Sequence, residues 1–317
     1  MIHCRSFEDL RTLSAPVSWA MGFFDGVHRG HARVLKAARR PGAAHGVLTF
    51  ENHPLTVLRP GDAPPLIVPD TAVKERLIRE LGAEVLLSLP FSPELASWTA
   101  PEFLGRLCAA CRCVHVAVGG NWRFGAGRAG DAAFLETEGN RLGFAVTRVP
   151  LKTSRGEVIC SSAIRRHLSE NRFARALELL GHPLWMSGTV TAGRRLARRW
   201  GFPTANVAVK SGVLPPFGVY AVRAHTGERL RPGIANFGIR PTVDRQPSAP
   251  ILEAHLFDFA EDLYGARLEV ELLRLLRRER SFPGQDALRR QIACDAAEAR
   301  RFFSSRPDAA DAGSVSH

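Results

Sequence analysis

The chain has 317 residues, of which 45% are hydrophobic and 23% are charged, and its formal net charge is +12 at pH 7. This length and composition are typical of a folded protein with two domains, each able to bury a core. No stretch approaches the roughly 20 apolar residues that span a bilayer, and the first residues lack the apolar segment of a secretory signal. We therefore expect a cytoplasmic protein with no membrane partner.

Short apolar runs alternate with helical patterns through the first half of the chain. Such alternation predicts βαβ units and a mainly parallel sheet. The predicted strands are residues 16–24, 45–50, 83–91, 114–120 and 144–150. The predicted helices are residues 25–40, 71–82, 101–111 and 134–143, with one or two more in 161–181.

The pattern changes to short strands in the second half, which predicts an antiparallel barrel or sandwich. These strands are residues 185–193, 204–210, 218–225, 231–238, 252–259 and 267–277. A helix is predicted over 283–303, with Pro283 in its first turn and with Leu288, Ile292, Ala299 and Phe303 on one face. We place the domains at residues 1–182 and 183–304, and expect a disordered tail at 305–317.

Six cysteines are spread along the chain, three of them close together at Cys108, Cys111 and Cys113. This cluster suggests metal ligands, but no second Cys or His pair stands at a zinc-type spacing. We therefore expect structural thiols in a reducing compartment.

The net charge of +12 requires that a nucleic-acid partner be considered. Most of the surplus is arginine, scattered as pairs through both halves without a long basic tail. A positive field equally favours polyanionic small molecules. We expect no nucleic acid as the primary partner.

The most informative segment is residues 22–31, between the first predicted strand and helix. His28 and His31 are three residues apart, so on a helix they share a face. Backbone N–H groups at a helix start favour phosphate, and two imidazoles there can donate further hydrogen bonds. Three glycines allow backbone and ligand to approach closely: Gly22, Gly26 and Gly30. Taken alone, the pattern also fits two surface histidines.

Residues 22–31 resemble the GxFDGVHxGH signature of bacterial bifunctional riboflavin kinase/FAD synthetases, a variant of the nucleotidyltransferase HxGH motif. Three further segments match that family in order: residues 49–54 resemble its TFEPHP, 120–131 its GxDFRFGxxRxGD loop, and 161–165 its SSTxIR segment. The resemblance implies a Rossmann-like α/β nucleotidyltransferase domain. Its reaction joins the FMN phosphate to the α-phosphorus of ATP, which forms FAD and releases pyrophosphate.

The resemblance implies that His28 and His31 are catalytic and stabilise charge on the phosphorus oxygens. The residues expected at the ATP phosphates are Gly22, Phe24, Asp25, Gly26, Ser161, Ser162 and Arg165. Asn121 and Asp131 are expected to bind the flavin, although the adenine is an alternative. Trp122 and Phe124 either stack on a ring or belong to the core. Without the resemblance, residues 161–165 also fit a helix cap with a surface arginine.

Thr204 and Asn206 open a predicted strand, where residues two apart point the same way. Their oxygens suit Mg²⁺, although alone they fit an ordinary strand start. Residues 203–206 match the PTAN motif of riboflavin kinases, and 236–242 and 252–259 resemble its NxGxRPT and ExHLFDF segments. The resemblance thus covers nearly the whole chain and implies a C-terminal β-barrel kinase domain with a terminal helix.

Phosphoryl transfer needs an aligned hydroxyl, a metal and a group that receives the proton. By resemblance, Glu253 takes the proton of the riboflavin 5′-hydroxyl, while Thr204 and Asn206 hold Mg²⁺ against the ATP phosphates. Arg240 is expected at the flavin. The alternative for Glu253 is an ion pair with that arginine.

The expected phosphate-side flap contains Gly193 and Arg198, and here the chain departs from the family. Arg195 and Ala197 stand near positions that are usually glycine, so the flap presents backbone N–H groups less readily. Phe23 stands where the family often has Asn, and Asn52 where it often has Pro. Because His28, His31 and Asp25 are retained, we expect the activity of the first site to survive the changes at Phe23 and Asn52.

The resemblance implies an enzyme that acts on riboflavin, FMN and ATP, and we expect a monomer or a weak homo-oligomer. Three alternatives stay open: an enzyme with one degenerate half, another nucleotidyltransferase with the same histidine motif, and a nucleic-acid-binding protein. The second does not explain the motifs beyond residue 200, and only the net charge supports the third.

Overall fold

The computed structural model describes residues 1–317 except 192–202, 210–211, 228, 240–249 and 306–317. The predicted site residues Gly193, Arg198 and Arg240, and nearly all of the predicted tail, lie outside the described residues. The chain forms two compact units. The first contains Met1–Arg165 and Leu179–Gly181, and the second contains Arg166–Glu178 and the chain from His182 onward.

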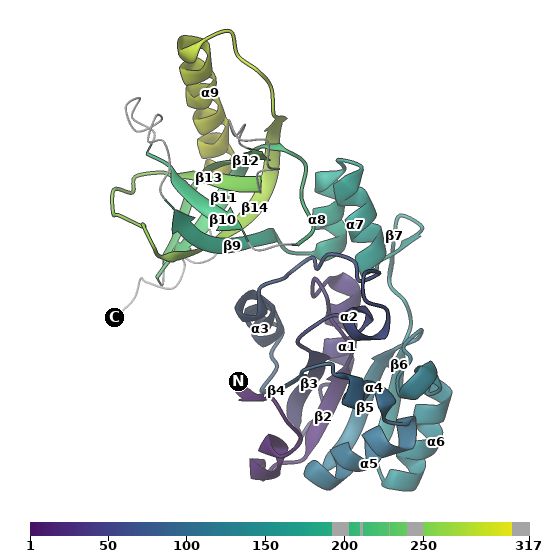
Figure 1. Ribbon diagram of the computed structural model, residues 1–317. Helices are drawn as coiled ribbons and strands as arrows, with labels where there is room; N and C mark the ends of the chain where they lie inside the picture. The colour runs from purple at the N-terminus through teal and green to yellow at the C-terminus, as the bar shows by residue number, and fades with distance from the viewer. Residues whose placement is uncertain (192–202, 210–211, 228, 240–249, 306–317) are drawn as a thin grey trace. The chain divides into compact units, whose positions relative to one another are not determined.

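The first unit is built on a sheet of six parallel strands in the order β1-β4-β3-β2-β5-β6 (Figure 1). The strands are β1 (Ile2–Cys4), β2 (Val17–Met21), β3 (Ala44–Phe50), β4 (Val85–Leu89), β5 (Cys113–Gly119) and β6 (Ala145–Val149). The predicted α/β class is confirmed, and β1 was not predicted. Its three residues are too short to produce a pattern.

The helices that alternate with these strands are α1 (Arg29–Ala37), α2 (Leu55–Leu58), α3 (Thr71–Glu80), α4 (Pro93–Ser97), α5 (Ala100–Ala110) and α6 (Ala132–Leu142). Two more helices follow, α7 (Ser161–Ser169), which is divided between the two units, and α8 (Phe173–Leu180), most of which belongs to the second unit. A short hairpin of β7 (Thr153–Ser154) and β8 (Glu157–Val158) precedes α7. Successive residues of β2 point to opposite faces of the sheet. Trp19 packs in the core beneath α5, whereas the hydroxyl of Ser18 donates a hydrogen bond to the end of α1.

The cysteines are all free thiols. Cys4, Cys111 and Cys113 are buried in the core cluster between the sheet and α5, and Cys108 packs against it. Among the described residues, no group of three or more His, Cys, Asp or Glu side chains is arranged to hold a metal ion.

The strand order places a topological switch point at β2 and β5. The chain leaves β2 towards β3 on one side, and leaves β5 towards β6 on the other. In open parallel sheets, ligands bind outside the carboxyl ends of the strands at such a point. The segment after β2 contains the histidine motif, and the segment after β5 contains Asn121.

A chain of polar contacts through the buried Ser18 and His115 fixes the far end of α1 to the sheet. The Nη2 of Arg40, which can only donate, lies 2.7 Å from Nε2 of His115. Nδ1 of His115 therefore carries the proton and donates to Ser18 Oγ at 2.9 Å. The Ser18 hydroxyl in turn donates to the carbonyl of Ala38, the C-cap of α1. The neutral imidazole thus holds the helix that begins beside His28.

The strands of the second unit close into an antiparallel barrel in the order β10-β13-β12-β11-β14-β9 (Figure 1). They are β9 (Leu184–Thr191), β10 (Ala205–Val209), β11 (Gly218–Thr226), β12 (Arg229–Ile239), β13 (Pro250–Leu256) and β14 (Arg267–Arg278). The barrel alternative is therefore confirmed over the sandwich. Most of α8 also belongs to this unit, and the ring of its Phe173 meets that of Tyr220 at 5.0 Å.

The terminal helix α9 (Gln285–Ser304) packs on the outside of the barrel against β11, β12 and β14. Ala296, Ala299 and Phe302 form the buried centre of its apolar face, which Ile292 and Phe303 flank. The placement of Pro283 in the first turn was wrong, because the N-cap is Gly284 and the helix begins one residue later. No described helix is long and apolar enough to cross a bilayer.

We predict that His115 makes the first unit sensitive to acid. Burial, and then the charge of Arg40, lower its pKa from 6.5 to about 4. Between these two pH values the unfolded chain binds a proton at His115 that the folded chain does not. The contribution of His115 to the stability is therefore fully present above pH 6.5 and is lost as the pH falls towards 4. Urea titrations should show a loss of about 2 kcal/mol in unfolding free energy between pH 7 and pH 5 from this residue. A His115→Gln variant should lack this component, and parallel pH profiles would contradict the assignment.

Candidate active sites

The turn between β2 and α1 has a strained backbone. Phe24 and Val27 have φ values of 54° and 39°, in the left-handed region that costs most for a β-branched residue such as Val27. Both side chains are buried. Gly26 also has a positive φ, of 78°, and a Cβ there would meet Ile67 at 3.1 Å. The surrounding core therefore imposes the turn that leads to the histidines.

His28 is the N-cap of α1 and not part of the helix. Its Nδ1 accepts hydrogen bonds from the backbone N–H groups of Gly30 at 3.1 Å and His31 at 3.2 Å. The imidazole proton is therefore assigned to Nε2. This corrects the expectation that both histidines lie on one helix face, and it means that the His28 ring already occupies two of the N–H groups at the helix start.

The two imidazoles are nevertheless in contact. The rings of His28 and His31 stack with centroids 3.5 Å apart and planes 16° from parallel. Burial, followed by the neighbouring His28 and Lys74, lowers the pKa of His31 well below its usual value. The buried Nδ1 of His31 has no hydrogen-bond partner among the described residues. The pair is thus a neutral hydrogen-bonding surface.

Asp25 connects three segments around this turn. Its carboxylate accepts hydrogen bonds from the backbone of Ile67 at 2.9 Å and Val68 at 3.4 Å, and it forms an ion pair with Arg165 on α7. Its carbonyl accepts from the hydroxyl of Ser161 at 3.0 Å. Burial raises the pKa of Asp25, and Arg165 opposes that rise.

The predicted phosphate residues therefore lie together, bound to one another. Arg165 also donates from Nε to the carbonyl of Pro65 at 2.8 Å, so these two contacts use two of its five N–H groups. Ser162 is exposed and lies 3.1 Å from the Cys160 thiol. Gly22 lies beneath the Phe24 ring, which a Cβ would meet at 2.9 Å.

The expected flavin loop follows β5. Asn121 is exposed, whereas Asp131 is the N-cap of α6, accepts from the Phe134 N–H at 2.9 Å and pairs with Arg123 at 3.0 Å. Trp122 stacks on Phe124 at 4.4 Å, and Phe124 is buried in the core. Asp131 therefore stabilises the start of α6 as its N-cap.

The two departures near the first site both make specific contacts. Asn52 forms a double bridge to Phe91, with its Oδ1 accepting from the N–H at 2.8 Å and its Nδ2 donating to the carbonyl at 3.0 Å. The Phe23 ring meets the edge of His53 at 4.8 Å.

The ammonium nitrogen of Lys74 lies over the Phe23 ring, 4.8 Å from its centroid. It was missed by the sequence analysis, although its spacing from Leu77 and Ile78 places it on the apolar face of α3.

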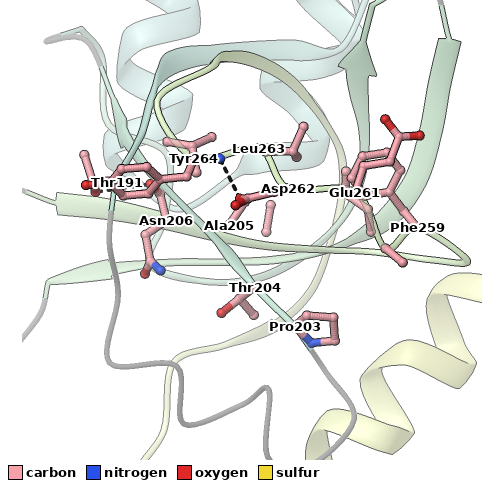
Figure 2. Close-up of a pocket in the computed structure, with 14 residues that line it drawn as sticks. Thr191, Pro203, Thr204, Ala205, Asn206, Phe259, Glu261, Asp262, Leu263 and Tyr264 are labelled. Carbon is pink, nitrogen blue, oxygen red and sulfur yellow. Dashed lines mark hydrogen bonds between the residues drawn. The ribbon is translucent and has the colours of Figure 1, made fainter.

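In the second unit, the described residues line a pocket of about 410 Å³ that contains Thr204 and Asn206. Figure 2 shows their side chains pointing to the same side of β10. Asp262, which accepts from the Tyr264 N–H at 2.9 Å, lies on the loop that closes the pocket. Asn206 is buried, and its carbonyl accepts from the Thr191 hydroxyl at 3.3 Å.

The strand register brings Glu253 beside Asn206. Glu253 on β13 is directly opposite Asn206 on β10 and opposite Asn236 on β12. Opposed residues in antiparallel strands have Cα atoms about 4.5–5.5 Å apart and share a face. Leu252 and Ala254 are buried on the other face, inside the barrel. The polar row therefore lies on its outer surface.

His255 fixes the backbone just before Thr204. Its Nδ1 donates to the carbonyl of Pro203 at 2.9 Å, just before Thr204. Burial lowers the pKa of His255, and the Pro203 contact opposes that change. The motif at residues 252–259 contains His255, but no local pattern in the sequence indicates that its partner is Pro203, 52 residues earlier.

Two family profiles match the chain: one described as FAD synthetase covers residues 11–163, and one described as riboflavin kinase covers residues 180–303. The bifunctional riboflavin kinase/FMN adenylyltransferase of Escherichia coli K12 is 40% identical over 293 residues, which are 89% of this chain and 91% of that protein. The chain belongs to this family. The Bacillus subtilis 168 member is 34% identical over 90% of this chain and 92% of that protein.

A crystal structure described as a macrolide-efflux protein from Streptococcus pneumoniae has 29% sequence identity and a TM-score of 0.81, covering 95% of this chain and 99% of that one. Family membership establishes the activity of the present protein. It is a riboflavin kinase and FMN adenylyltransferase, which uses ATP to convert riboflavin to FMN and FMN to FAD.

We predict that Gly30→Ala impairs FAD formation. A Cβ at Gly30 would lie 3.0 Å from the His28 ring and 3.2 Å from the Ile159 carbonyl, so the ring must move. Since misplacing a group by about 1 Å can cost 100-fold in rate, we expect FAD formation from FMN and ATP to slow by about 10- to 100-fold. Gly105→Ala on α5, where a Cβ meets nothing within 4 Å, is the control. Equal rates for both variants would show that the ring position is unimportant.

Proposed function

We propose that adenylyl transfer takes place at the histidine turn of the first unit, with His28 and His31 as its catalytic residues. The observation that carries this assignment is the stacked imidazole pair at the switch point of the sheet. Nε2–H of His28 donates to oxygens of the α-phosphate, where negative charge grows as the FMN phosphate attacks. Since both rings are neutral, they act through directed hydrogen bonds and not as cations.

Several neighbours position the nucleotide in this proposal. The backbone at Gly22, Phe24 and Gly26 lies against the ATP phosphates, and Asp25 orients Arg165 towards the β,γ-phosphates. The N–H groups of Arg165 beyond its two described contacts suit a phosphate. Ser161 and Ser162 at the start of α7 contribute hydroxyls. Asn121 and Asp131 bind the flavin.

We propose that riboflavin phosphorylation takes place on the outer surface of the barrel. Glu253 accepts the proton of the riboflavin 5′-hydroxyl as its oxygen attacks the γ-phosphorus of ATP and ADP leaves. The register that sets Glu253 opposite Asn206 supports this role.

The hydroxyl of Thr204 and the amide oxygen of Asn206 form a donor set of hard oxygens, which suits Mg²⁺. When bound, this ion would neutralise charge on the ATP phosphates. Gly193, Arg198 and Arg240 complete the proposal as phosphate-side and flavin-side residues outside the described residues. We also propose a cytoplasmic protein, monomeric or weakly self-associating, with the adenylylation half at residues 1–182 and the kinase half at 183–304.

Product chromatography tests whether adenylylation and phosphorylation take place in separate halves of the chain. With riboflavin and Mg-ATP, His28→Ala should accumulate FMN and form FAD at least about 100-fold more slowly. Glu253→Ala should leave riboflavin unphosphorylated, with a loss of about 100- to 10,000-fold, yet make FAD from added FMN. Each variant controls for the folding of the other half. FAD formation at the normal rate by His28→Ala would refute the first site, and FMN formation by Glu253→Ala would refute the second.

The role of Thr204 predicts a change in metal requirement. Thr204→Val keeps the shape of the side chain and removes the oxygen, so the Mg²⁺ concentration for half-maximal kinase rate should rise about 10-fold. Thr189→Val, at an exposed position of β9, is the matched control. An unchanged Mg²⁺ titration for Thr204→Val would contradict the assignment.

A further inference from the structure

Lys74 is a cation placed inside the framework of the first site. Its ammonium nitrogen donates to the carbonyl of Phe23 at 2.8 Å, to Thr49 Oγ1 at 2.9 Å and to the carbonyl of Phe50 at 3.1 Å. These three bonds match the three donors of an ammonium group. The hydroxyl of Thr49 also donates to the Phe23 carbonyl at 2.8 Å, so the end of β3 and the histidine turn are joined through one cluster.

The residue type is itself informative in this chain. Of its 43 lysines and arginines, only Lys36, Lys74, Lys152 and Lys210 are lysines. A planar guanidinium directs its N–H groups in a fixed fork, whereas an ammonium directs three donors from one point. Three oxygens that converge on a single nitrogen therefore require lysine.

The position of this charge is costly. Lys74 as a whole is half-buried, but burial of its ammonium group lowers its pKa to about 8, against the opposing charge of Asp25. A desolvated cation is retained where it has a use, since an apolar side chain of similar size would avoid this cost.

The charge of Lys74 also acts on His31. Lys74 is among the causes, after burial and His28, that hold the pKa of His31 below its usual value. The titratable and charged groups near Lys74 come from the turn, from α1, from the segment after β3 and from α7: Asp25, His28, His31, His53 and Arg165.

We propose that Lys74 is a positioning residue for adenylyl transfer: its ammonium ties the Phe23 carbonyl to the end of β3 and places a positive charge near His31. The first effect maintains the strained turn that leads into His28. The second disfavours a proton on His31, whose ring stacks on that of His28. This inference rests on the proposed site at His28 and His31.

The rate test uses the full chain and compares four variants. Lys74→Met and Lys74→Gln should each lower kcat for FMN adenylylation by about 10- to 100-fold, with KM for ATP changed much less, because geometry and not affinity is lost. Lys74→Arg should not restore the rate, since the fork cannot reach all three oxygens. Phe23→Leu keeps the carbonyl and all three bonds, so its kcat should stay within about 3-fold of the parent. The riboflavin kinase rate of each sample verifies folding.

The second test separates the charge from mere packing. The His31 signal, assigned by its loss in His31→Asn, is followed by NMR during a pH titration. Its pKa should rise in Lys74→Met and Lys74→Gln, and should stay low in Lys74→Arg and in Thr49→Val, which keep the cation. A structural role alone would not divide the variants by charge.

The outcomes distinguish a failure of the proposed site at His28 and His31 from a failure of the role proposed for Lys74. Normal FAD formation by His28→Ala would remove the proposed site itself. Loss of activity in His28→Ala, together with normal kcat in both Lys74→Met and Lys74→Gln, would overturn only the role of Lys74. An unchanged His31 titration in these two variants would equally overturn the proposal, because its electrostatic half would be absent.

Discussion

The buried carboxylate of Asp25 is the interaction on which the first site depends. It is bound at once by backbone N–H groups of residues 67–68 and by Arg165 on α7, while its own carbonyl is held by Ser161. Three segments distant in the sequence therefore meet at one acidic side chain. A carboxylate can be buried here only because these donors replace its water. The strained backbone at Phe24 and Val27 persists because this cluster and the core determine its path.

The second unit positions its chemistry in a different way. Its polar row lies on regular strands, where the hydrogen-bonding register alone sets Asn206, Glu253 and Asn236 side by side. Strain is unnecessary, because alternation directs these side chains outward while Val207, Leu252 and Phe237 fill the interior. His255 then ties the irregular start of β10 to the same strand as Glu253. One protein thus contains a site built on an irregular turn and another built on sheet geometry.

The sequence predicted the architecture well because strand and helix periodicity are local signals, and it located both candidate sites through their motifs. The geometry within the first site was less accessible. Whether His28 belongs to the helix or caps it depends on its own ψ of 171°, which no spacing rule reports. Asn52 looked like a departure from a family pattern, yet its bonds to Phe91 span 39 residues. Lys74 was overlooked because one lysine on an apolar face resembles a surface residue until its three acceptors are known.

The outward row on β13 has a consequence for how the barrel assembles. A slip of one residue in the pairing of this strand would turn Glu253 inward and Leu252 outward. Such a mispaired molecule would confine an ionised carboxylate among aliphatic side chains and expose a leucine to water. The same alternation that turns the proposed proton acceptor outward thus penalises wrong pairing, so a barrel with this register error would also be less stable.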